Sequence, residues 1–487
     1  MNGERLIVVS NRLPVTVRRS GGEFCLESSG GGLVSALAPV LSETGGCWIG
    51  WTGTDFDKSL AEAVADWSAR RNYHLEPVFL TPEENASYYR GFSNEIIWPL
   101  FHGLPSRCHF HSTYWDGYCR VNEKFADVVE LVAGTSDFIW VQDYHLMMLA
   151  RDLRARHIVQ RLGYFHHIPF PPPDIFETLP WRSQVLRGLL QFDVLGFQTP
   201  RDRRNFVECL HRCLPRVQVS GIGERLLARL EGQWSSIGTY PISIDYRNFC
   251  SEASEPAVTA AAEQMRQRFS ATQVILGVDR LDYTKGIPER LTAFQRLLET
   301  NPELCGRVTM IQIVVPSRED IPEYMQLRLH IETLVSKING EYTRPGWVPI
   351  HYFHRSFPRK ELIAFYRAAD VALVTPLRDG MNLVAKEFCA ARIDNRGALV
   401  LSEFAGAAAE LQNGALLVNP HDIDTVASVL ARALRMTEPE QSLRMQRMRS
   451  HLESHNVFHW SQSFKIPPDP SPSAVRHGQA VAAHAVP

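Results

Sequence analysis

An aspartate and a histidine directly follow two consecutive apolar runs in the first half of the chain. Asp143 comes after Phe138–Gln142, and His167 comes after Leu162–His166. The carboxyl ends of parallel strands meet at one edge of a sheet, so we expect both side chains at the floor of a ligand site. The pair suits polar catalysis, although a structural hydrogen bond would use the same residue types. No acidic or cysteine partner stands at metal-ligand spacing from the two histidines, so a metal is not indicated.

Residues that suit phosphate binding follow the first apolar run. Arg12 lies in Ser10–Pro14, where an arginine at a strand end can bind a phosphate or carboxylate with two parallel hydrogen bonds. Gly30–Gly32 opens a predicted helix and leaves backbone N–H groups for a phosphate or a sugar. The alternatives are an ordinary surface arginine and a flexible glycine loop. The glycines do not match G-x-G-x-x-G, so NAD binding is not expected.

The second half carries another phosphate-seeking group after a predicted strand. Arg280 and Lys285 follow Val274–Val278 and precede a helix, so their charges and the helix N-terminus can converge on one diphosphate. A solvated basic pair is the simpler alternative. The stretch Thr375–Glu387 also follows a strand and opens a helix. Glu387 lies about one helical turn in, where its carboxylate can bind a ribose diol or merely favour the helix dipole.

The elements that must position these residues alternate between short apolar runs and longer helix-patterned segments. Strands are predicted at Leu6–Ser10, Cys47–Trp51, Leu75–Leu80, Phe138–Gln142, Leu162–His166, Val194–Gln198, Ser235–Pro241, Val274–Val278, Thr309–Val314, Val371–Thr375 and Leu399–Ser402. Helices are predicted at Leu33–Leu41, Trp115–Leu131, Leu146–Arg156, Trp181–Gln191, Arg201–Cys213, Pro288–Thr300, Ile321–Asn339, Arg359–Ala369 and Asp422–Arg435. Unbroken runs of Val, Ile and Leu suit strands buried on both faces, so this α/β pattern predicts doubly wound parallel sheets.

The length of 487 residues exceeds what one hydrophobic core normally supports, so we expect two domains. A polar stretch near 240–254 marks the boundary and predicts domains 1–240 and 241–465, with a last helix able to pack back on the first domain. The strand ends of the two domains are expected to face a central cleft. The segment 466–487 is rich in Pro, Ala and Ser, and we expect it to be disordered.

Composition and charge exclude several classes of partner. Lys and Arg total 51 and Asp and Glu total 53, so the formal net charge of -2 gives no global basic field for nucleic acid or anionic membrane. The nine cysteines are scattered without C-x-x-C, which argues against a disulfide framework and a zinc site. No apolar run approaches the roughly 20 residues that span a bilayer. We therefore expect a soluble cytoplasmic protein without nucleic-acid or membrane partners.

A set of motifs along the chain gives these separate signals a common interpretation. They are SNRLP (10–14), the glycine loop before Leu33, YYRGFSNEIIW (88–98), WDGY (115–118), DYHL (143–146), HIPFP (167–171), RLDYTKG (280–286), SR (317–318), ING (338–340) and TPLRDGMNLVAKE (375–387). Together they resemble the trehalose-6-phosphate synthase family, glycosyltransferase family 20, over residues 5–462. The insert Pro14–Ser29 departs from the shorter bacterial members, and we expect it to reshape the lip of the donor loop.

The resemblance implies a GT-B glycosyltransferase with two Rossmann-like domains facing a central cleft. Such an enzyme would move glucose from UDP-glucose to glucose 6-phosphate with retention of configuration, giving trehalose 6-phosphate and UDP. UDP-glucose would be a co-substrate, and no cofactor or metal would be required. The resemblance is compatible with a homo-oligomer, either a dimer or a tetramer, and it implies a separate trehalose-6-phosphate phosphatase downstream.

The resemblance also implies roles for individual residues. Those that would hold glucose 6-phosphate are Arg12, Tyr89, Trp98, Asp143 and Arg318, with the two arginines on its phosphate. Those that would bind UDP-glucose are Gly31, Gly32, His167, Arg280, Lys285, Phe357, Asp379, Met381, Asn382, Leu383, Val384 and Glu387. The catalytic set would be Asp143, His167, Arg280 and Lys285. The two cations would stabilise the leaving diphosphate, and the other two would line the reacting carbon without forming a covalent bond.

Two alternative functions stand beside this interpretation. A sister synthase uses glycerol 3-phosphate to make glucosylglycerol phosphate, but Ser10–Arg12 and Ser317–Arg318 match the trehalose branch. A non-catalytic sugar-phosphate sensor should have lost motif residues, and the charged ones named above are all present. The sequence does not decide between UDP-, ADP- and GDP-glucose, because backbone groups would make most contacts with the base.

Overall fold

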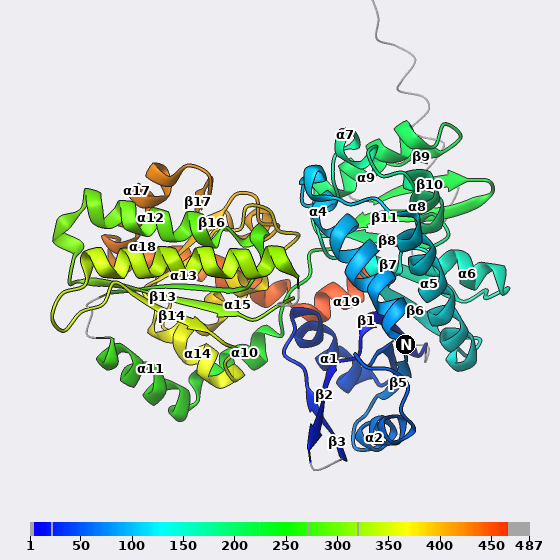
Figure 1. Ribbon diagram of the computed structural model, residues 1–487, viewed down its shortest axis with the longest axis horizontal. Helices are drawn as coiled ribbons and strands as arrows, with labels where there is room; N and C mark the ends of the chain where they lie inside the picture. Colours follow the sequence, from blue (N-terminus) through cyan, green and yellow to red (C-terminus); the bar gives the residue numbers. More distant parts are fainter. Residues whose placement is uncertain (1–3, 21–22, 224, 270–272, 319–320, 466–487) are drawn as a thin grey trace, which may run out of the picture. The chain divides into compact units, whose positions relative to one another are not determined.

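The computed structural model describes residues 4–20, 23–223, 225–269, 273–318 and 321–465 (Figure 1). Its contacts divide the chain into two compact units, one of Met1–Pro241 with Trp460–Pro487 and the other of Ile242–His459. The tail 466–487, for which the sequence predicts disorder, lies outside the described residues.

The first unit is built on a nine-stranded sheet in the order β5-β4-β1-β6-β7-β8-β11-β10-β9. Its strands are β1 Leu6–Arg12, β4 Cys47–Trp51, β5 His74–Val78, β6 Phe138–Gln142, β7 Arg161–His166, β8 Val194–Phe197, β9 Gln218–Ser220, β10 Arg225–Leu230 and β11 Gln233–Thr239. From β5 to β11 the neighbours are parallel, and β10 and β9 extend one edge as antiparallel strands. The order reverses at β1, so the carboxyl ends of β1 and β6 form a topological switch point, where α/β folds bind ligands.

Helices connect the parallel strands of the first unit. They are α1 Gly32–Thr44, α2 Lys58–Ala69, α3 Pro82–Glu84, α4 Trp98–Phe101, α5 Ser112–Val132, α6 Leu149–Ala155, α7 Pro173–Phe176, α8 Arg182–Leu189 and α9 Pro200–Cys213, with a π-helix at Asn85–Ile97 and 3₁₀ turns at Pro105–Arg107 and Tyr144–Leu146. The insert Pro14–Ser29 forms an antiparallel hairpin of β2 Val15–Ser20 and β3 Glu23–Ser28, with Val15 opposite Ser28.

The second unit contains a six-stranded parallel sheet in the order β14-β13-β12-β15-β16-β17. Its strands are β12 Gln273–Arg280, β13 Val308–Val315, β14 Ile350–His354, β15 Val371–Val374, β16 Ala398–Ser402 and β17 Leu416–Val418. The switch point lies between β12 and β15. The two motifs with the most charged residues, Arg280–Gly286 and Thr375–Glu387, begin at the carboxyl ends of these two strands.

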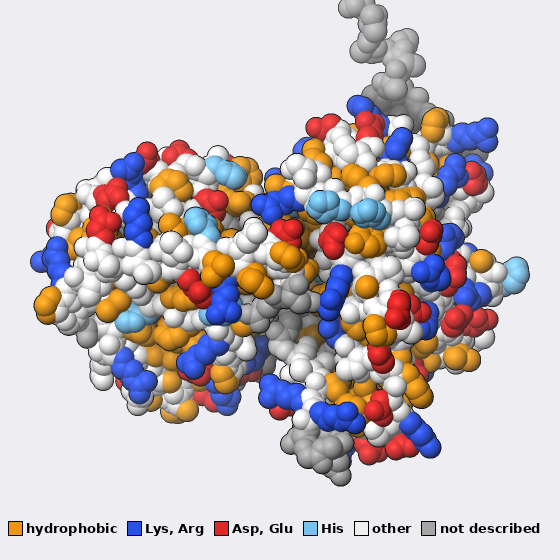
Figure 2. Space-filling model, viewed as in Figure 1, with side chains coloured by type: hydrophobic (Ala, Val, Ile, Leu, Met, Phe, Trp, Pro, Cys, Tyr) orange, Lys and Arg blue, Asp and Glu red, His pale blue; other side chains and the backbone are white. Residues whose placement is uncertain are grey.

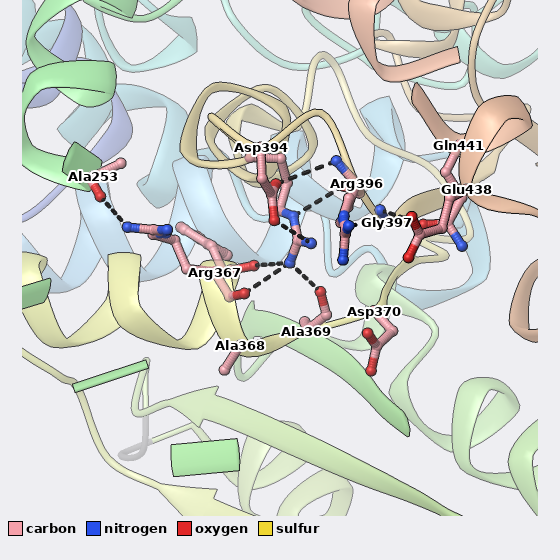
Figure 3. A network of polar contacts seen from close by, with 12 residues as sticks. Ala253, Arg367, Ala368, Ala369, Asp370, Asp394, Arg396, Gly397, Glu438 and Gln441 are labelled. Carbon is pink, nitrogen blue, oxygen red and sulfur yellow. Dashed lines mark hydrogen bonds and ion pairs between the residues drawn. The ribbon is translucent and has the colours of Figure 1, made fainter. Parts of the chain in front are cut away.

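The helices of the second unit are α10 Tyr246–Ser254, α11 Pro256–Arg268, α12 Ile287–Thr300, α13 Pro322–Tyr342, α14 Arg359–Ala368, α15 Leu383–Ala391, α16 Ala408–Leu411, α17 Ile423–Leu434 and α18 Glu438–Ser454, with 3₁₀ turns at Tyr283–Lys285 and Pro302–Leu304. A polar network fixes the C-terminal end of α15 (Figure 3). Arg392, which caps α15, donates to the carbonyls of Arg367 at 2.7 Å and Ala369 at 2.5 Å. Arg367 in turn donates to the carbonyl of Ala253 at 2.7 Å. The network therefore ties the C-terminus of α15 to α14 and, through Arg367, to α10.

Helix α19, Val457–Lys465, ends the described chain, and from Trp460 onward it packs on the sheet of the first unit. The ring of Trp140 on β6 lies 4.7 Å from those of both Trp460 and Phe464, measured between centroids. Gly163 on β7 makes this packing possible, because a Cβ there would lie 2.7 Å from the Phe464 ring.

The surface agrees with the balanced composition, since basic and acidic side chains are interspersed on the face shown in Figure 2. No helix among the described residues combines the length and apolar character needed to cross a membrane. All nine cysteines belong to the described part of the chain, and each is a free thiol.

Candidate functional site

Asp143 and His167 come together at the carboxyl ends of β6 and β7. The Asp143 N–H donates to the carbonyl of Phe165 at 2.8 Å, and Oδ1 of Asp143 accepts the N–H of His167 at 3.2 Å. Asp143 has a φ of 73° and a ψ of 169°, a conformation that residues other than glycine rarely adopt. Such strain costs roughly 1–3 kcal/mol and is concentrated at functional sites. The strained backbone therefore marks Asp143 as a candidate functional residue.

The imidazole of His167 is held by side-chain amides from two neighbouring strand ends. Its Nε2 donates to Oε1 of Gln142 at 2.8 Å, and its Nδ1 lies 3.5 Å from Nε2 of Gln198. Burial lowers the pKa of His167 to about 3, with a further contribution from the neighbouring His166. The ring is therefore neutral near pH 7 and can orient a substrate, but it carries no extra proton to donate. In the described part of the chain, no three His, Cys, Asp or Glu side chains gather as a metal site would require.

A series of ring contacts links the other predicted acceptor residues of the first unit. Successive members lie 4.0–6.1 Å apart, measured between ring centroids or from the guanidinium carbon. In order, the members are Arg12, Trp51, Tyr89, His145, Tyr144 and Trp98. Tyr89 lies within the π-helix Asn85–Ile97, and Trp98 follows its end. Such helices are rare and are frequently found at functional sites. The structure thus gathers Arg12, Tyr89 and Trp98 along one side of the Asp143 strand end.

An irregularity between β1 and β4 sets the position of Arg12. The register shifts between Val9, which faces Ile49, and Arg12, which faces Trp51. An extra residue of this kind bends a strand and redirects its side chains. Gly53, with a φ of 97°, then lies against the guanidinium, because a Cβ on it would be 1.8 Å from Nη1 of Arg12. The guanidinium therefore packs against both the Gly53 backbone and the Trp51 ring.

Replacing Gly53 by alanine should displace the Arg12 guanidinium and raise the KM for glucose 6-phosphate, the acceptor that the family resemblance implies, by about 10-fold, which corresponds to ~1.4 kcal/mol. Gly232 offers a matched control in the same unit, because its φ is 92° and a Cβ on it would meet nothing within 4 Å. Both variants carry the strain of a side chain at positive φ, but only Gly53→Ala should change the KM. Steady-state kinetics and thermal unfolding of the two variants measure the difference, and equal KM values would contradict the role of Arg12.

The predicted donor glycines stand at the start of α1. Gly31 is the N-cap residue, and the first-turn N–H groups that follow have no intrahelical partner. A Cβ on Gly30 would meet nothing within 4 Å, and one on Gly31 would reach only Val34 Cγ2 at 4.0 Å. Packing therefore does not require glycine here. The open space in front of Gly30 and Gly31 suits the close approach of a ligand to the backbone.

Lys285 and Asp379 meet at the switch point of the second unit. Nζ of Lys285 lies 2.6 Å from Oδ2 of Asp379, and the two side chains are only 10% and 15% exposed. Gly286 lets the two strand ends approach, since its φ is 62° and a Cβ on it would lie 2.3 Å from the carbonyl oxygen of Thr375. Arg280, the last residue of β12, is exposed at the same edge. The structure thus assembles two cations and a carboxylate at this position.

The loop between Asp379 and α15 is fixed by its own side chains. Asn382 has a φ of 82°, its Oδ1 caps α15, and its Nδ2 donates to Oδ2 of Asp379 at 3.2 Å. The Met381 N–H donates to Oδ1 of Asp379 at 3.4 Å. Beyond this loop, Leu383 and Val384 begin α15, and N–H groups in a first helical turn attract anions. The arrangement provides a preformed place for a phosphate.

Glu387 and Phe357 lie in different surroundings. Glu387, one turn further along α15, accepts a hydrogen bond from Tyr366 Oη at 2.8 Å. Burial raises the pKa of Glu387, and the hydrogen bond from Tyr366 opposes this rise. Phe357 instead belongs to an aromatic cluster, with ring centroids 5.5 Å from Phe353 and 5.0 Å from Phe365. The carboxylate of Glu387 is therefore oriented by α14, while Phe357 is fixed in the segment just before that helix.

Arg318, the remaining predicted acceptor residue, lies in the second unit, and its side chain is only 8% exposed. Its Nη1 donates to Oη of Tyr324 at 2.5 Å and lies 3.6 Å from Oδ2 of Asp282. The φ of Arg318 is 51°, so its backbone also departs from the usual regions. Two buried groups, rather than solvent, therefore set its orientation.

Sequence reasoning missed the buried groups behind these loops. Arg290 of α12 is fully buried, pairs with Oδ2 of Asp279 at 2.5 Å, and donates to Oγ1 of Thr375 at 3.1 Å. It thereby joins the ends of β12 and β15. Asp279 and Asp282 have no role in the prediction from sequence, whereas the structure pairs both carboxylates with arginines. One signal was available, because Arg290 interrupts the apolar face of its helix that begins at Ile287.

Comparisons with known proteins agree on one family. The model of Glycosyltransferase family 20 matches residues 4–466. A trehalose-6-phosphate synthase of Mycobacterium marinum is 43% identical over 468 residues, which cover 94% of this chain and 92% of the relative. The UDP-forming alpha,alpha-trehalose-phosphate synthase of Candida albicans is 38% identical over 467 residues, covering 94% of this chain and 96% of the relative.

Solved structures give the same result. An alpha,alpha-trehalose-phosphate synthase (UDP-forming) from Burkholderia xenovorans, in complex with glucose 6-phosphate, is 36% identical with a TM-score of 0.86, covering 94% of this chain and 98% of that one. A trehalose-6-phosphate protein from E. coli, bound with UDP-2-fluoro glucose, is 38% identical with a TM-score of 0.84, covering 95% and 98%. These likenesses confirm the predicted GT-B fold with its Rossmann-like units. The chain therefore belongs to glycosyltransferase family 20.

Proposed function

We propose that this chain is a retaining glucosyltransferase that moves glucose from UDP-glucose to glucose 6-phosphate, releasing UDP and forming trehalose 6-phosphate. The observation that carries the proposal is the group at the β12–β15 switch point, where Lys285 pairs with Asp379 beside Arg280 and the N-terminus of α15. This group offers positive charge to a diphosphate and a carboxylate to sugar hydroxyls. Relatives named as UDP-forming synthases support the same donor.

In the proposed reaction, the bond between glucose C1 and the phosphate oxygen breaks as C1 bonds to the anomeric hydroxyl oxygen of glucose 6-phosphate. The proton of that hydroxyl passes to the leaving phosphate oxygen on the same face, which accounts for retention without a protein nucleophile. Negative charge grows on the diphosphate, and Arg280, Lys285 and the first N–H groups of α15 are already oriented to stabilise it. The pKa of about 3 for His167 supports a positioning role, because at neutral pH the ring lacks the extra proton that an imidazolium acid would supply.

We also propose that the transfer needs neither a cofactor nor a metal ion, because Arg280 and Lys285 supply the positive charge that a divalent cation would otherwise provide. A cytoplasmic location, a homo-oligomer and a separate downstream phosphatase are proposals that rest on the family resemblance alone.

The test is nucleotide release from UDP-, ADP- and GDP-glucose, each with and without glucose 6-phosphate, and each with and without EDTA. We expect UDP release that depends on glucose 6-phosphate, is unchanged by EDTA, and gives an α-configured product by NMR. Faster release with glycerol 3-phosphate would identify the sister synthase instead. Absence of release with every donor, together with calorimetric binding of glucose 6-phosphate, would identify a sensor.

A further inference from the structure

Asp282 is a buried carboxylate whose two oxygens face two different groups of residues. It lies two residues after the end of β12 and is 2% exposed. Its Oδ1 accepts the N–H of Thr284 at 3.0 Å and the Thr284 hydroxyl at 2.8 Å. These bonds begin the short 3₁₀ turn Tyr283–Lys285, which carries the lysine of the proposed diphosphate site. Oδ1 therefore sets the geometry of the donor turn.

The other oxygen of Asp282 faces the arginine proposed for the acceptor phosphate. Oδ2 accepts the hydroxyl of Tyr324 at 3.4 Å and lies 3.6 Å from Nη1 of Arg318. The Tyr324 oxygen in turn accepts from Nη1 of Arg318 at 2.5 Å. Asp282, Tyr324 and Arg318 thus form a closed triangle, and the backbone of Arg318 is held at a φ of 51°, which residues other than glycine seldom adopt. Oδ2 therefore helps to set the direction of this guanidinium.

Cations proposed for the donor and a cation proposed for the acceptor balance the negative charge of Asp282. Burial would raise the pKa of Asp282, but the charges of Arg318, Lys285 and Arg280, with the hydrogen bond from the Thr284 N–H, outweigh this effect and leave the pKa lowered. The carboxylate is consequently ionised at neutral pH. A single negative charge thus stands between the arginine assigned to one substrate and the two cations assigned to the other.

We propose that Asp282 is a positioning residue for both substrates, with Oδ1 shaping the turn that places Lys285 on the donor diphosphate and Oδ2 orienting Arg318 toward the acceptor phosphate. This inference rests on the proposed function and adds residues that touch neither substrate. It further assigns the hydroxyl of Tyr324 to the acceptor side, because this hydroxyl contacts Oδ2 and Arg318, whereas the Tyr324 ring packs 5.5 Å from that of Tyr283 in the donor turn, measured between centroids. The simpler reading of Asp282, as a cap for a turn, accounts for Oδ1 but not for the Oδ2 contacts.

Three variants separate the two roles. Asp282→Asn keeps an oxygen for Thr284 but turns an amide NH2 toward Arg318, so we expect the glucose 6-phosphate KM to rise ~10- to 100-fold while the UDP dissociation constant stays within about 3-fold. Tyr324→Phe should raise that KM ~3- to 10-fold and leave UDP binding unchanged. Asp282→Ala removes both functions and should also weaken UDP binding by about 10-fold. In the double variant Asp282→Asn/Tyr324→Phe, the two effects should combine to less than their product, because both act through one guanidinium.

Asp422→Ala is the matched control. Asp422 caps α17 by accepting the N–H of Thr425 at 3.0 Å and its hydroxyl at 2.7 Å, so the same chemistry occurs there at an exposed helix start. Its loss should lower the unfolding temperature slightly and leave both substrate constants unchanged. Thermal unfolding of all variants, with UDP binding by calorimetry, shows whether each remains folded.

The outcomes distinguish this inference from the proposed function. If the unaltered protein releases no UDP with glucose 6-phosphate, the proposed function fails. If it does, but a folded Asp282→Asn variant has an unchanged glucose 6-phosphate KM, only the positioning role fails. Equal losses of UDP binding and acceptor KM in Asp282→Asn would also overturn it, because they would indicate general damage to the turn. A multiplicative double variant would overturn the assignment of Tyr324.

Discussion

Replacing Arg318 by alanine should raise the KM for glucose 6-phosphate by about 100-fold while changing the UDP dissociation constant by less than about 3-fold. The guanidinium is 8% exposed and already oriented by Tyr324 and Asp282, so the folded protein does not have to order it when a phosphate binds. A charge-assisted pair of this kind typically loses about 2–5 kcal/mol when one partner is truncated. The donor set keeps Arg280, Lys285 and the N-terminus of α15, so UDP should bind nearly as before.

Arg328→Ala is a useful comparison for this variant. Arg328 lies on α13 near Tyr324, but it forms an ion pair with Glu332 at 2.8 Å with a side chain that is 42% exposed. Its removal should leave both substrate constants unchanged, since exposed pairs of this type contribute at most about 1 kcal/mol. Arg318→Lys should recover part of the lost affinity, because it restores the charge but not the forked geometry. Normal acceptor kinetics in Arg318→Ala would remove the residue from the acceptor site.

The central strands could be predicted because burial on both faces leaves a clear sequence signal. β4 and β6 have the bounds expected from Cys47–Trp51 and Phe138–Gln142, and every residue in both strands is buried. Short unbroken apolar runs of this kind have few other places in a folded chain. The strand order of the first sheet places Asp143 at a switch point, and that of the second sheet places Arg280 at another. Residues that follow strands were good candidates for this reason.

Edge strands and hairpins could not be predicted in the same way. β14, Ile350–His354, is only partly buried beyond its first residue, and β2 is largely polar after Val17, so pairing rather than burial makes them strands. The β10–β11 hairpin turns at Glu231 and Gly232, both at positive φ, where Asn-Gly or Asp-Gly is the usual signal. The unusual glutamate at the first position conceals that turn.

The residues of the candidate site also differ in how well the sequence predicts them. Arg12, Lys285 and Glu387 belong to contiguous motifs, and each could be proposed from type and position alone. Tyr324 could not, because its partner Asp282 lies 42 residues away and their contact depends on how α13 packs against α12 and β14. Pairs of this kind are fixed by tertiary packing, and a single sequence contains no local pattern for them.

Replacing Lys285 by methionine should lower kcat by about 100- to 1000-fold, a larger effect than on UDP affinity. Preorganised groups that face developing charge contribute roughly 3–4 kcal/mol to a transition state, and the leaving diphosphate gains its charge beside Lys285. In the resting structure the ammonium is balanced by Asp379 at 2.6 Å. When the donor binds, the ammonium of Lys285 must therefore be shared between Asp379 and the diphosphate. Its greatest contribution to catalysis comes as the bond between glucose C1 and the phosphate oxygen breaks.

The Lys285→Met result needs to be separated from a loss of stability, because the variant leaves the largely buried carboxylate of Asp379 without its cation. Removing one partner of a buried pair can cost up to about 3–5 kcal/mol, and the 15% exposure of Asp379 should reduce this figure. The double variant Lys285→Met/Asp379→Asn removes the uncompensated charge, so it should regain thermal stability while turnover stays low. Lys285→Arg, which keeps a cation, should retain more turnover than Lys285→Met. If the double variant recovers both stability and turnover, the lysine serves the fold rather than the transition state. If Lys285→Met raises the UDP dissociation constant as much as it lowers kcat, the role of Lys285 is ground-state binding of UDP.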